Sequence, residues 1–405
     1  MEFQSVEQMA KRLQVTTRTV QKWAKEGKIP GAYQMGRTWL IPEEFCMPVA
    51  TEEIAVTAEC VPSARESEST SIPLAQETRP LLDAIFDPGK CLEHVESYPQ
   101  GVQRDVLASQ YYYFSGQPEK AVQLAEPYLD HKDPAVALIA SVAYCFANLS
   151  LGKVRLFEVG QEHIRKYAQV CLRDSQDPQA RAYAVYITTM VHVLMHVATP
   201  PMPSLVSELS NLPMGARLHA GYLMAHEAYL EKDYRRCLGI VEMALALCGD
   251  TYVIPAIYLH LMASVALMNL RRIVEAKAQF ERAWQLIRED GFTAILGEHI
   301  GMLQGLLEVS LKKQCPEEYA AVLNQVAHFA DGWRKVHNAG AKRTVADQLT
   351  AVEMAVASLF HRGWAVKEIA AYMEISPRMV KHHMSVVYEK LGISHREELS
   401  QYMVL

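Results

Sequence analysis

Polar and basic side chains near the N-terminus have the types and spacing needed to contact nucleic acid. Between Lys11 and Lys28, six basic residues are opposed by a single acid, Glu26. Lys and Arg side chains neutralise backbone phosphates, and short polar side chains among them hydrogen-bond to base edges. The side chains that share one face of a helix here are Thr17, Arg18, Gln21 and Lys22. Such a face fits the major groove, so the pattern predicts double-stranded DNA as a partner.

Other residues with chemical potential lack the partners that catalysis or metal binding requires. His192 and His196 are four apart on an expected helix, but no third ligand is nearby, and their apolar neighbours favour histidines packed in the core. Residues 31–38 nearly spell a phosphate-binding loop, but Arg37 stands where lysine is needed and no strand leads into a helix there. The pair at 226–227 lacks the second histidine of a zinc-protease motif. We expect no enzyme, no cofactor and no metal.

The composition bounds the class of protein. Half of the residues are apolar and 21% are charged, which supplies buried cores and excludes global disorder. No apolar stretch is long enough to span a membrane, and the N-terminus lacks the features of an export signal. The eight cysteines form no C-x-x-C pair, which fits a reducing compartment. We therefore expect a soluble cytoplasmic protein.

The net charge of −6 argues against nucleic acid only when it is averaged over the chain. Residues 1–45 carry a net charge of +2, whereas residues 46–80 carry −4 with four prolines and no aromatic residue. That composition predicts a flexible acidic linker. Residues 349–405 are neutral overall, so the remaining acidity lies in residues 81–348. The head that is expected to bind DNA is therefore basic.

Two short helices are predicted to position the N-terminal cluster. Ser5 and Gln8 fit a capping box at the start of the first helix. The second helix is expected over residues 17–26, with Thr16 as its N-cap and Gly27 just after its end. The apolar residues expected to pack these helices together are Val6, Met9, Ala10, Leu13, Val20 and Trp23. The pattern is that of a helix-turn-helix.

Residues 29–42 then predict two short strands around a turn at Gly36, which form a wing. The string SVEQMAKRLQVTTRTVQKWAKEGKIPGAYQMGRTWLIPEEF closely resembles the winged helix-turn-helix of the excisionase and MerR-like DNA-binding family. The resemblance implies that the second helix reads bases and that Arg37 in the wing contacts the backbone or the minor groove. The alternative is a small helical packing module with a solvated basic face.

Residues 81–346 read as helical throughout, with a weak internal repeat. The segments 113–128, 229–244 and 267–283 share a helix–turn–helix pattern with small residues in register. They resemble degenerate tetratricopeptide-type repeats, which implies an α-solenoid of about five or six hairpins. Its concave surface is expected to take a peptide, small-molecule or protein effector; a scaffold without a ligand is the alternative.

The C-terminal residues predict a bundle of four helices with clear boundary signals. The first helix opens at 349–353 and runs to about His361, and a second covers residues 367–373. Ser376 is a suitable N-cap for a long helix that begins at Pro377 and stops at Gly392. Residues 394–397 form another capping box for the last helix, which ends near residue 402.

These elements resemble the LuxR-type helix-turn-helix domain. The matching motifs are LT-x-x-E at 349–353, KEIA at 367–370, IS at 375–376, VK at 380–381 and KLGI at 390–393. The resemblance implies that the long helix is the recognition helix, that its early residues read bases, and that nearby basic residues contact phosphates. The implied base-reading residues are Lys381, His382 and Ser385, and the implied phosphate contacts are Lys367, Arg378 and Lys390. Because the domain is neutral overall, a homodimer is expected to be needed for tight binding.

The sequence therefore predicts a mainly α protein of four parts. They are a winged helix-turn-helix at 1–45, a flexible acidic linker at 46–80, a helical-repeat sensor or assembly domain at 81–346 and a LuxR-type DNA-binding domain at 347–405. The expected function is that of a bacterial sequence-specific transcriptional regulator whose repeats sense a ligand or partner. The alternative is a protein-interaction scaffold in which one helix-turn-helix has become a docking surface.

Overall fold

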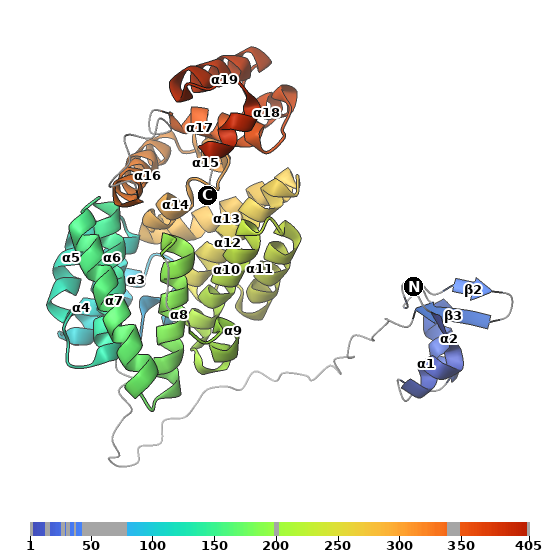
Figure 1. Cartoon of the computed structure of the whole chain (residues 1–405), viewed down its shortest axis with the longest axis horizontal. Helices are drawn as coiled ribbons and strands as arrows, with labels where there is room; N and C mark the ends of the chain where they lie inside the picture. The colour runs from blue at the N-terminus through green and yellow to red at the C-terminus, as the bar shows by residue number, and fades with distance from the viewer. Residues whose placement is uncertain are drawn as a thin grey trace. The chain divides into compact units, whose positions relative to one another are not determined.

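The computed structural model confirms a mainly α chain (Figure 1). It describes residues 3–12, 17–25, 29, 33–35, 38–42, 79–197, 202–337 and 349–402. These fall into two compact units, Met1–Thr70 and Ser71–Leu405. Most of the linker expected at 46–80 lies outside the described residues, which include only its last two positions.

The N-terminal unit combines two helices with a small antiparallel sheet. Its elements are β1 (Phe3–Ser5), α1 (Val6–Arg12), α2 (Thr17–Lys25), β2 (Tyr33–Met35) and β3 (Thr38–Pro42). The wing predicted from the sequence is the β2–β3 hairpin, in which Met35 pairs with Thr38. The added strand β1, which the sequence analysis missed, pairs with the other edge of β3 and gives the order β1-β3-β2.

The start of α1 has the predicted capping box. The Ser5 backbone N–H donates to Gln8 Oε1 at 2.7 Å, and the Gln8 N–H donates to Ser5 Oγ at 3.2 Å. Val6, Met9 and Val20 are buried between the helices, as their helical spacing predicted. The expected N-cap of the second helix, its expected Gly27 stop and the residues of the wing turn lie outside the described residues.

Antiparallel hairpins of long helices form most of the second unit. Within its described residues, four such pairs are regular: α4 (Val102–Phe114) with α5 (Pro118–Ala125), α6 (Pro134–Ser150) with α7 (Val154–Asp174), α10 (Met214–Leu230) with α11 (Tyr234–Cys248), and α12 (Val253–Asn269) with α13 (Ile273–Asp290). First helices of neighbouring hairpins also pack together, α4 on α6 and α10 on α12. Each hairpin thus buries one face against the next.

The remaining elements of the repeat region are less regular. They are η2 (Leu81–Asp83), α3 (Cys91–Glu96), η3 (Glu126–Tyr128), α8 (Pro178–Met195), α9 (Leu205–Glu208), η4 (Leu209–Asn211), α14 (Ala294–His299), α15 (Leu306–Leu311) and α16 (Pro316–His337). Helix α8 packs against α7 and α10, but its next neighbours in sequence are the short α9 and η4 rather than a second long helix. The repeat is therefore interrupted between the second and third regular hairpins.

One turn geometry closes all four hairpins. Each connection has three residues, and its middle residue has a left-handed φ of +62 to +70°. These middle residues are Gly116, Gly152, Lys232 and Arg271. In each hairpin the last loop residue donates its N–H to a carbonyl five residues earlier, for example Gln117 to Tyr112 at 2.8 Å. This six-to-one hydrogen bond is the Schellman motif, which satisfies carbonyls at a helix end.

Helix α16 returns to an early hairpin, where it packs against α6 as well as α14 (Figure 1). The contact depends on Gly332. A Cβ on this residue would collide with the carbonyl oxygen of Leu149 and would lie 2.8 Å from that of Ser150. The backbones of α16 and the end of α6 therefore approach too closely for any side chain.

We expect Gly332→Ala to lower the free energy of unfolding by about 2 kcal/mol because the new methyl group collides with backbone rather than with a movable side chain. Helix propensity alone predicts the opposite sign, since alanine is favoured in a helix interior by roughly 1 kcal/mol. Gly239→Ala on α11 is the matched control because nothing lies within 4 Å of its built Cβ. Urea denaturation of both variants tests the contact; equal stabilisation would contradict it.

The C-terminal helices are α17 (Ala351–His361), α18 (Val366–Met373), α19 (Pro377–Leu391) and the 3-10 helix η6 (Arg396–Gln401). The first three of the four expected helices are present. Helix α17 begins two residues later than predicted, with Thr350 as its N-cap. The fourth element differs from the prediction. It is a 3-10 helix, and its cap is a bond from the His395 N–H to Glu398 Oε1 rather than a box between Ser394 and Glu397.

Candidate nucleic-acid interface

Helix α19 is delimited by the residues that the sequence indicated. Ser376 Oγ accepts the N–H of Met379 at 3.1 Å, and Pro377 occupies the first helical position. Gly392 ends the helix with a φ of +64°, where glycine has no steric penalty. The structure therefore fixes the length of the predicted recognition helix.

One side of α19 is buried and the other is exposed. The inward side chains are Val380, Met384, Val387 and Leu391, which recur every three or four residues. The outward side chains predicted to contact DNA are Arg378, Lys381, His382 and Ser385, and all four are exposed. The first half of the helix therefore presents basic and polar side chains to solvent, together with the exposed Met379.

Lys367 lies at the second position of α18, the helix that precedes α19, and its side chain is exposed. Helix α18 packs directly against α19, and Glu374, with a left-handed φ of +55°, ends it. This rigid pair sets the angle between the two helices. Lys367 is thereby placed on a separate element from the cations of α19, as a phosphate-contacting lysine in a helix-turn-helix would be.

Lys390 differs from the other predicted contacts because its ammonium group is engaged inside the domain. Its Nζ lies 2.7 Å from Glu353 Oε2, and the side chain is 29% exposed. Burial would raise the pKa of Glu353, but the Lys390 ammonium and the Thr350 donors outweigh it, so that the pKa lies below its usual value. The pair holds the end of α19 against the start of α17.

The N-terminal helix-turn-helix exposes part of its predicted face. Thr17 and Gln21 are exposed on α2, opposite the buried Val20 and Ala24. The side chains of Arg18 and Lys22, and the whole of Arg37, lie outside the described residues. The burial of α2 thus agrees with an amphipathic helix at the five positions whose side chains are described, the fifth being the exposed Lys25.

A set of cationic contacts that the sequence analysis did not find docks the C-terminal helices onto the repeats. The Arg271 guanidinium lies 4.3 Å from the ring centroid of Trp364, and its Nη1 is 3.6 Å from Glu368. Arg362 donates to the Tyr229 hydroxyl at 2.6 Å and to Asn269. Lys313 forms an ion pair with Glu374, and Lys277 lies over the Tyr372 ring. These contacts involve α17, α18 and the segments next to them, whereas the exposed face of α19 makes none of them.

A cavity of about 680 Å³ lies where the repeats meet α17. Helices α10, α14 and α16 contribute Tyr222, Glu298 and Phe329, and α17 contributes Met354 and Ser358. A smaller cavity of about 60 Å³ adjoins it, because Phe146, Leu194 and Glu298 line both. Residues of the repeat region and of the C-terminal helices therefore share its wall.

The two histidines of α8 are not packed in the core, contrary to the sequence-based expectation. Helix α8 ends at Met195, so His196 adopts a left-handed conformation outside it, and both histidine side chains are exposed. The His196 ring lies edge-on to Trp333, with centroids 5.8 Å apart. Among the residues that the structure describes, no group of three His, Cys, Asp or Glu side chains is placed to hold a metal ion.

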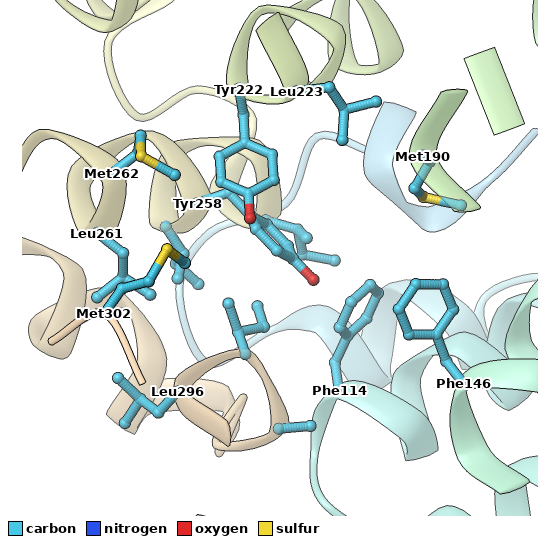
Figure 2. Packing of buried hydrophobic residues seen from close by; sticks show 14 of the residues in the cluster. Phe114, Phe146, Met190, Tyr222, Leu223, Tyr258, Leu261, Met262, Leu296 and Met302 are labelled. Carbon is cyan, nitrogen blue, oxygen red and sulfur yellow. The ribbon is translucent and has the colours of Figure 1, made fainter. Parts of the chain in front are cut away.

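Tyrosines, histidines and one glutamate form a buried polar cluster next to the cavity. Tyr258 donates to Glu298 Oε2 at 2.8 Å, and Tyr113 donates to Oε1. Figure 2 shows Tyr222 and Tyr258 beside each other, with Phe114 and Phe146 nearby, so that residues from α4, α6, α10 and α12 converge. The cluster lies among hydrophobic residues, which explains why burial raises the pKa of Glu298 from 4.5 to about 7.

Glu298→Gln is expected to change how stability depends on pH. The raised pKa means that the folded state favours the protonated acid; this contribution is fully present below pH 4.5 and is lost as the pH rises through 7. Relative to the glutamine variant, the wild type should lose about 2 kcal/mol of stability between pH 5 and pH 8. Chemical denaturation of both proteins at the two pH values measures this difference, in which the other titrating groups cancel. A difference that does not change with pH would contradict a buried carboxyl.

Among the helices that the structure describes, none is long and apolar enough to cross a membrane.

Comparison with known proteins identifies both helix-turn-helix modules. Residues 347–403 match the model of bacterial regulatory proteins of the luxR family, and residues 5–44 match a helix-turn-helix domain model. The chain is similar to the transcriptional regulatory protein UhpA of Salmonella typhimurium, with 38% identity over 96 residues, which cover 23% of this chain and 48% of that protein. It is also similar to UhpA of Escherichia coli, with 46% identity over 57 residues, or 14% and 29% of the two chains.

The chain thus spans less than half the length of these curated relatives. No solved structure matches it. The resemblances inferred from the sequence are confirmed for the two ends of the chain: an excisionase-like helix-turn-helix domain near the N-terminus and a LuxR-type domain at the C-terminus.

Proposed function

We propose that this protein is a sequence-specific, double-stranded DNA-binding transcriptional regulator whose repeat domain senses an effector. One observation carries the proposal: the recognition helix of a LuxR-type module exposes the basic and polar side chains of its first half. Lys381, His382 and Ser385 then read base edges in the major groove, and Arg378 and Lys367 contact phosphates. Lys390 lies in the last turn of α19, where its ion pair with Glu353 supports the helix and its side chain lies near the DNA backbone.

The neutral charge of the C-terminal module supports a requirement for more than one reading head. Each phosphate that a protein neutralises adds to the salt-dependent part of its affinity, and a module without net positive charge gains little from long-range attraction. A homodimer, or joint binding with the N-terminal face of Thr17, Arg18, Gln21, Lys22 and Arg37, supplies that gain through effective concentration. We therefore infer that operators contain at least two recognition sequences.

Docking of the DNA-binding helices onto the repeats provides a route for regulation. Helix α17 packs against α19 and also lines the large cavity, while α18 packs against α15 of the repeat region. A molecule in the cavity therefore touches both the repeats and the scaffold of the recognition helix. Its binding energy can favour one docked arrangement over another only if its contacts differ between the two.

Selection of bound DNA from a random pool by the full chain tests the proposal. We expect one enriched motif to disappear in Lys381→Glu and another in Arg18→Glu, with each variant retaining the motif read by its intact module. Enrichment of the same motifs by the wild type and both variants would refute sequence reading by these helices. Enrichment of no motif by the wild type would refute sequence-specific binding.

A further inference from the structure

The large cavity has the size and lining of a small-molecule site. Its volume of about 680 Å³ lies within the range of roughly 300–1,000 Å³ that is typical of ligand pockets. Most of its wall is apolar, with Phe146, Leu230, Met302, Phe329 and Trp333 among the lining side chains. A few polar groups interrupt this wall, and their hydrogen-bonding roles decide which ligand it suits.

The hydrogen-bond network makes His226 an acceptor towards the cavity. His299 Nδ1 is 2.7 Å from the carbonyl of Ile295, so it carries the proton and its Nε2 accepts the Tyr222 hydroxyl at 3.0 Å. The Tyr222 oxygen then accepts from His226 Nδ1–H at 3.3 Å. Burial lowers the pKa of His226 to about 3, so the ring is neutral and its Nε2 keeps a lone pair. Among the described residues, none bonds to that Nε2.

Glu298 is the second acceptor, and it is the only acidic side chain among the described residues that line the cavity. Its two oxygens accept the hydroxyls of Tyr113 and Tyr258, which are neutral donors, and no cationic side chain in the described ranges pairs with it. Each carboxylate oxygen retains a further lone pair. Because Glu298 lines both the large cavity and the smaller one, it lies where the two cavities adjoin. A buried carboxylate without a cation is costly unless a ligand supplies the cation.

The remaining charged group of the cavity points elsewhere. Arg362 is the lining guanidinium; its two terminal nitrogens donate to Tyr229 and Asn269, and its Nε is buried without a hydrogen-bond partner among the described residues. The rings near Glu298 are those of Phe146 and Tyr222, and aromatic faces attract cations within about 6 Å. The acceptors that this network leaves on the wall are therefore Glu298 and His226, and Ser358, His196 and His361 complete its polar part.

We propose that this cavity binds a small apolar molecule that carries a protonated amine, with Glu298 as its counter-ion and His226 Nε2 accepting a second N–H. The proposal rests on the sensing role proposed above and assigns its ligand class. The apolar part of the molecule lies against Phe329 and Trp333 of α16. From there it reaches Met354 and Ser358 of α17, so that occupancy strengthens the contact between the repeats and the DNA-binding domain.

Titration calorimetry on the full chain with small amines as probes tests the ligand class. The probes are 2-phenylethylamine and tryptamine, and the matched controls are the neutral 2-phenylethanol and the anionic 3-phenylpropionate. We expect both amines to bind at least about tenfold more tightly than either control. The reason is that a charge-assisted hydrogen bond at a desolvated site contributes more than about 1.4 kcal/mol, the free energy that corresponds to a tenfold change in affinity. Equal or tighter binding of the anion, or the absence of amine binding at millimolar concentration, would overturn the proposal.

Two variants locate the bound amine. Glu298→Gln keeps the shape of the side chain and should weaken amine binding at least about tenfold while leaving 2-phenylethanol binding unchanged. Ala330→Phe projects a ring from α16 into the cavity and should weaken binding of every probe. Unaltered amine affinity in either variant would place the site elsewhere. DNA affinity is measured separately, on protein without ligand. A negative result for amine binding therefore contradicts the amine site alone, and a negative result for DNA binding contradicts the regulator proposal alone.

Discussion

Lys381→Glu is expected to reduce the affinity of the full chain for its selected DNA by about 100-fold. Lys381 is the fifth residue of α19, and its side chain is exposed. It lies among the early residues that a helix in the major groove brings to base edges. Loss of one good base contact costs about 1–3 kcal/mol, and the new carboxylate adds repulsion from the phosphates on both sides. Fluorescence anisotropy at constant salt measures the change.

The matched control for this variant is Lys132→Glu. Lys132 is an exposed lysine of the repeat region, so its reversal changes the net charge equally without altering α19. We expect the control to change affinity by less than about threefold, because a distant charge acts only through the screened long-range field. Equal losses in both variants would show that overall charge, rather than this helix, determines binding.

The salt dependence separates reading from anchoring. Replacing a phosphate-contacting side chain such as Arg378 should lower the slope of log affinity against log salt concentration by about one and should affect all sequences alike. Replacing Ser385 should leave the slope unchanged and relax the preference at one base pair. These opposite signatures assign each exposed residue of α19 to one role.

Local signals in the sequence predicted most elements at the two ends of the chain. Caps such as Ser5 and Ser376 and stops such as Gly392 act through hydrogen bonds within a few residues, so their chemistry is visible in the sequence itself. Strand β1 escaped because three residues carry too little pattern, and because Ser5 already served as a helix cap. The last helix is a 3-10 helix whose cap lies at His395 instead of Ser394, a difference of one residue that the sequence pattern did not resolve.

The repeats show where such signals fail. Three of the four regular hairpins could be recognised in the sequence because a small residue occupies the same buried position in the second helix of each. These residues are Ala121, Cys237 and Ala276. The fourth hairpin has Phe157 at that position and gains its close approach one turn later, where a Cβ on Gly160 would lie 3.0 Å from Cys145. Its left-handed turn residue, Gly152, was the signal that remained in the sequence.

The docking contacts and the cavity could not be predicted because they join residues that are far apart in the chain. Arg271 meets Trp364 across about ninety residues, and no local pattern specifies that meeting. Glu298 gave no sequence signal for the same reason, since its donors come from α4 and α12. In the sequence, Arg271 is simply one residue of a repeat segment. In the structure it has a left-handed φ in the turn, and its side chain contacts Glu368 of the DNA-binding domain.

Glu353→Ala should lower the free energy of unfolding of the C-terminal module by about 3 kcal/mol. Glu353 is 7% exposed and accepts both the Thr350 N–H at 2.8 Å and the Lys390 ammonium at 2.7 Å. The substitution removes half of a capping box and leaves a partly buried ammonium without its counter-ion, a loss that costs more than an exposed ion pair contributes. Lys390 can still reach water, which keeps the cost below that of a fully buried pair.

Glu389→Ala is the control for this substitution because it removes an exposed carboxylate from the same helix that carries Lys390, and we expect a change within about 0.5 kcal/mol. The lowered pKa of Glu353 adds a second signature: its stabilisation is present at neutral pH and is lost as the pH falls through the lowered pKa of the folded state, so the wild type and the alanine variant should converge in acid. Denaturation followed at two pH values measures both effects.

The same ion pair holds the end of α19 in place. Glu353→Ala should therefore also weaken DNA binding under conditions where the module remains folded. A destabilised variant with unchanged DNA affinity would mean that α19 is oriented by its apolar face alone.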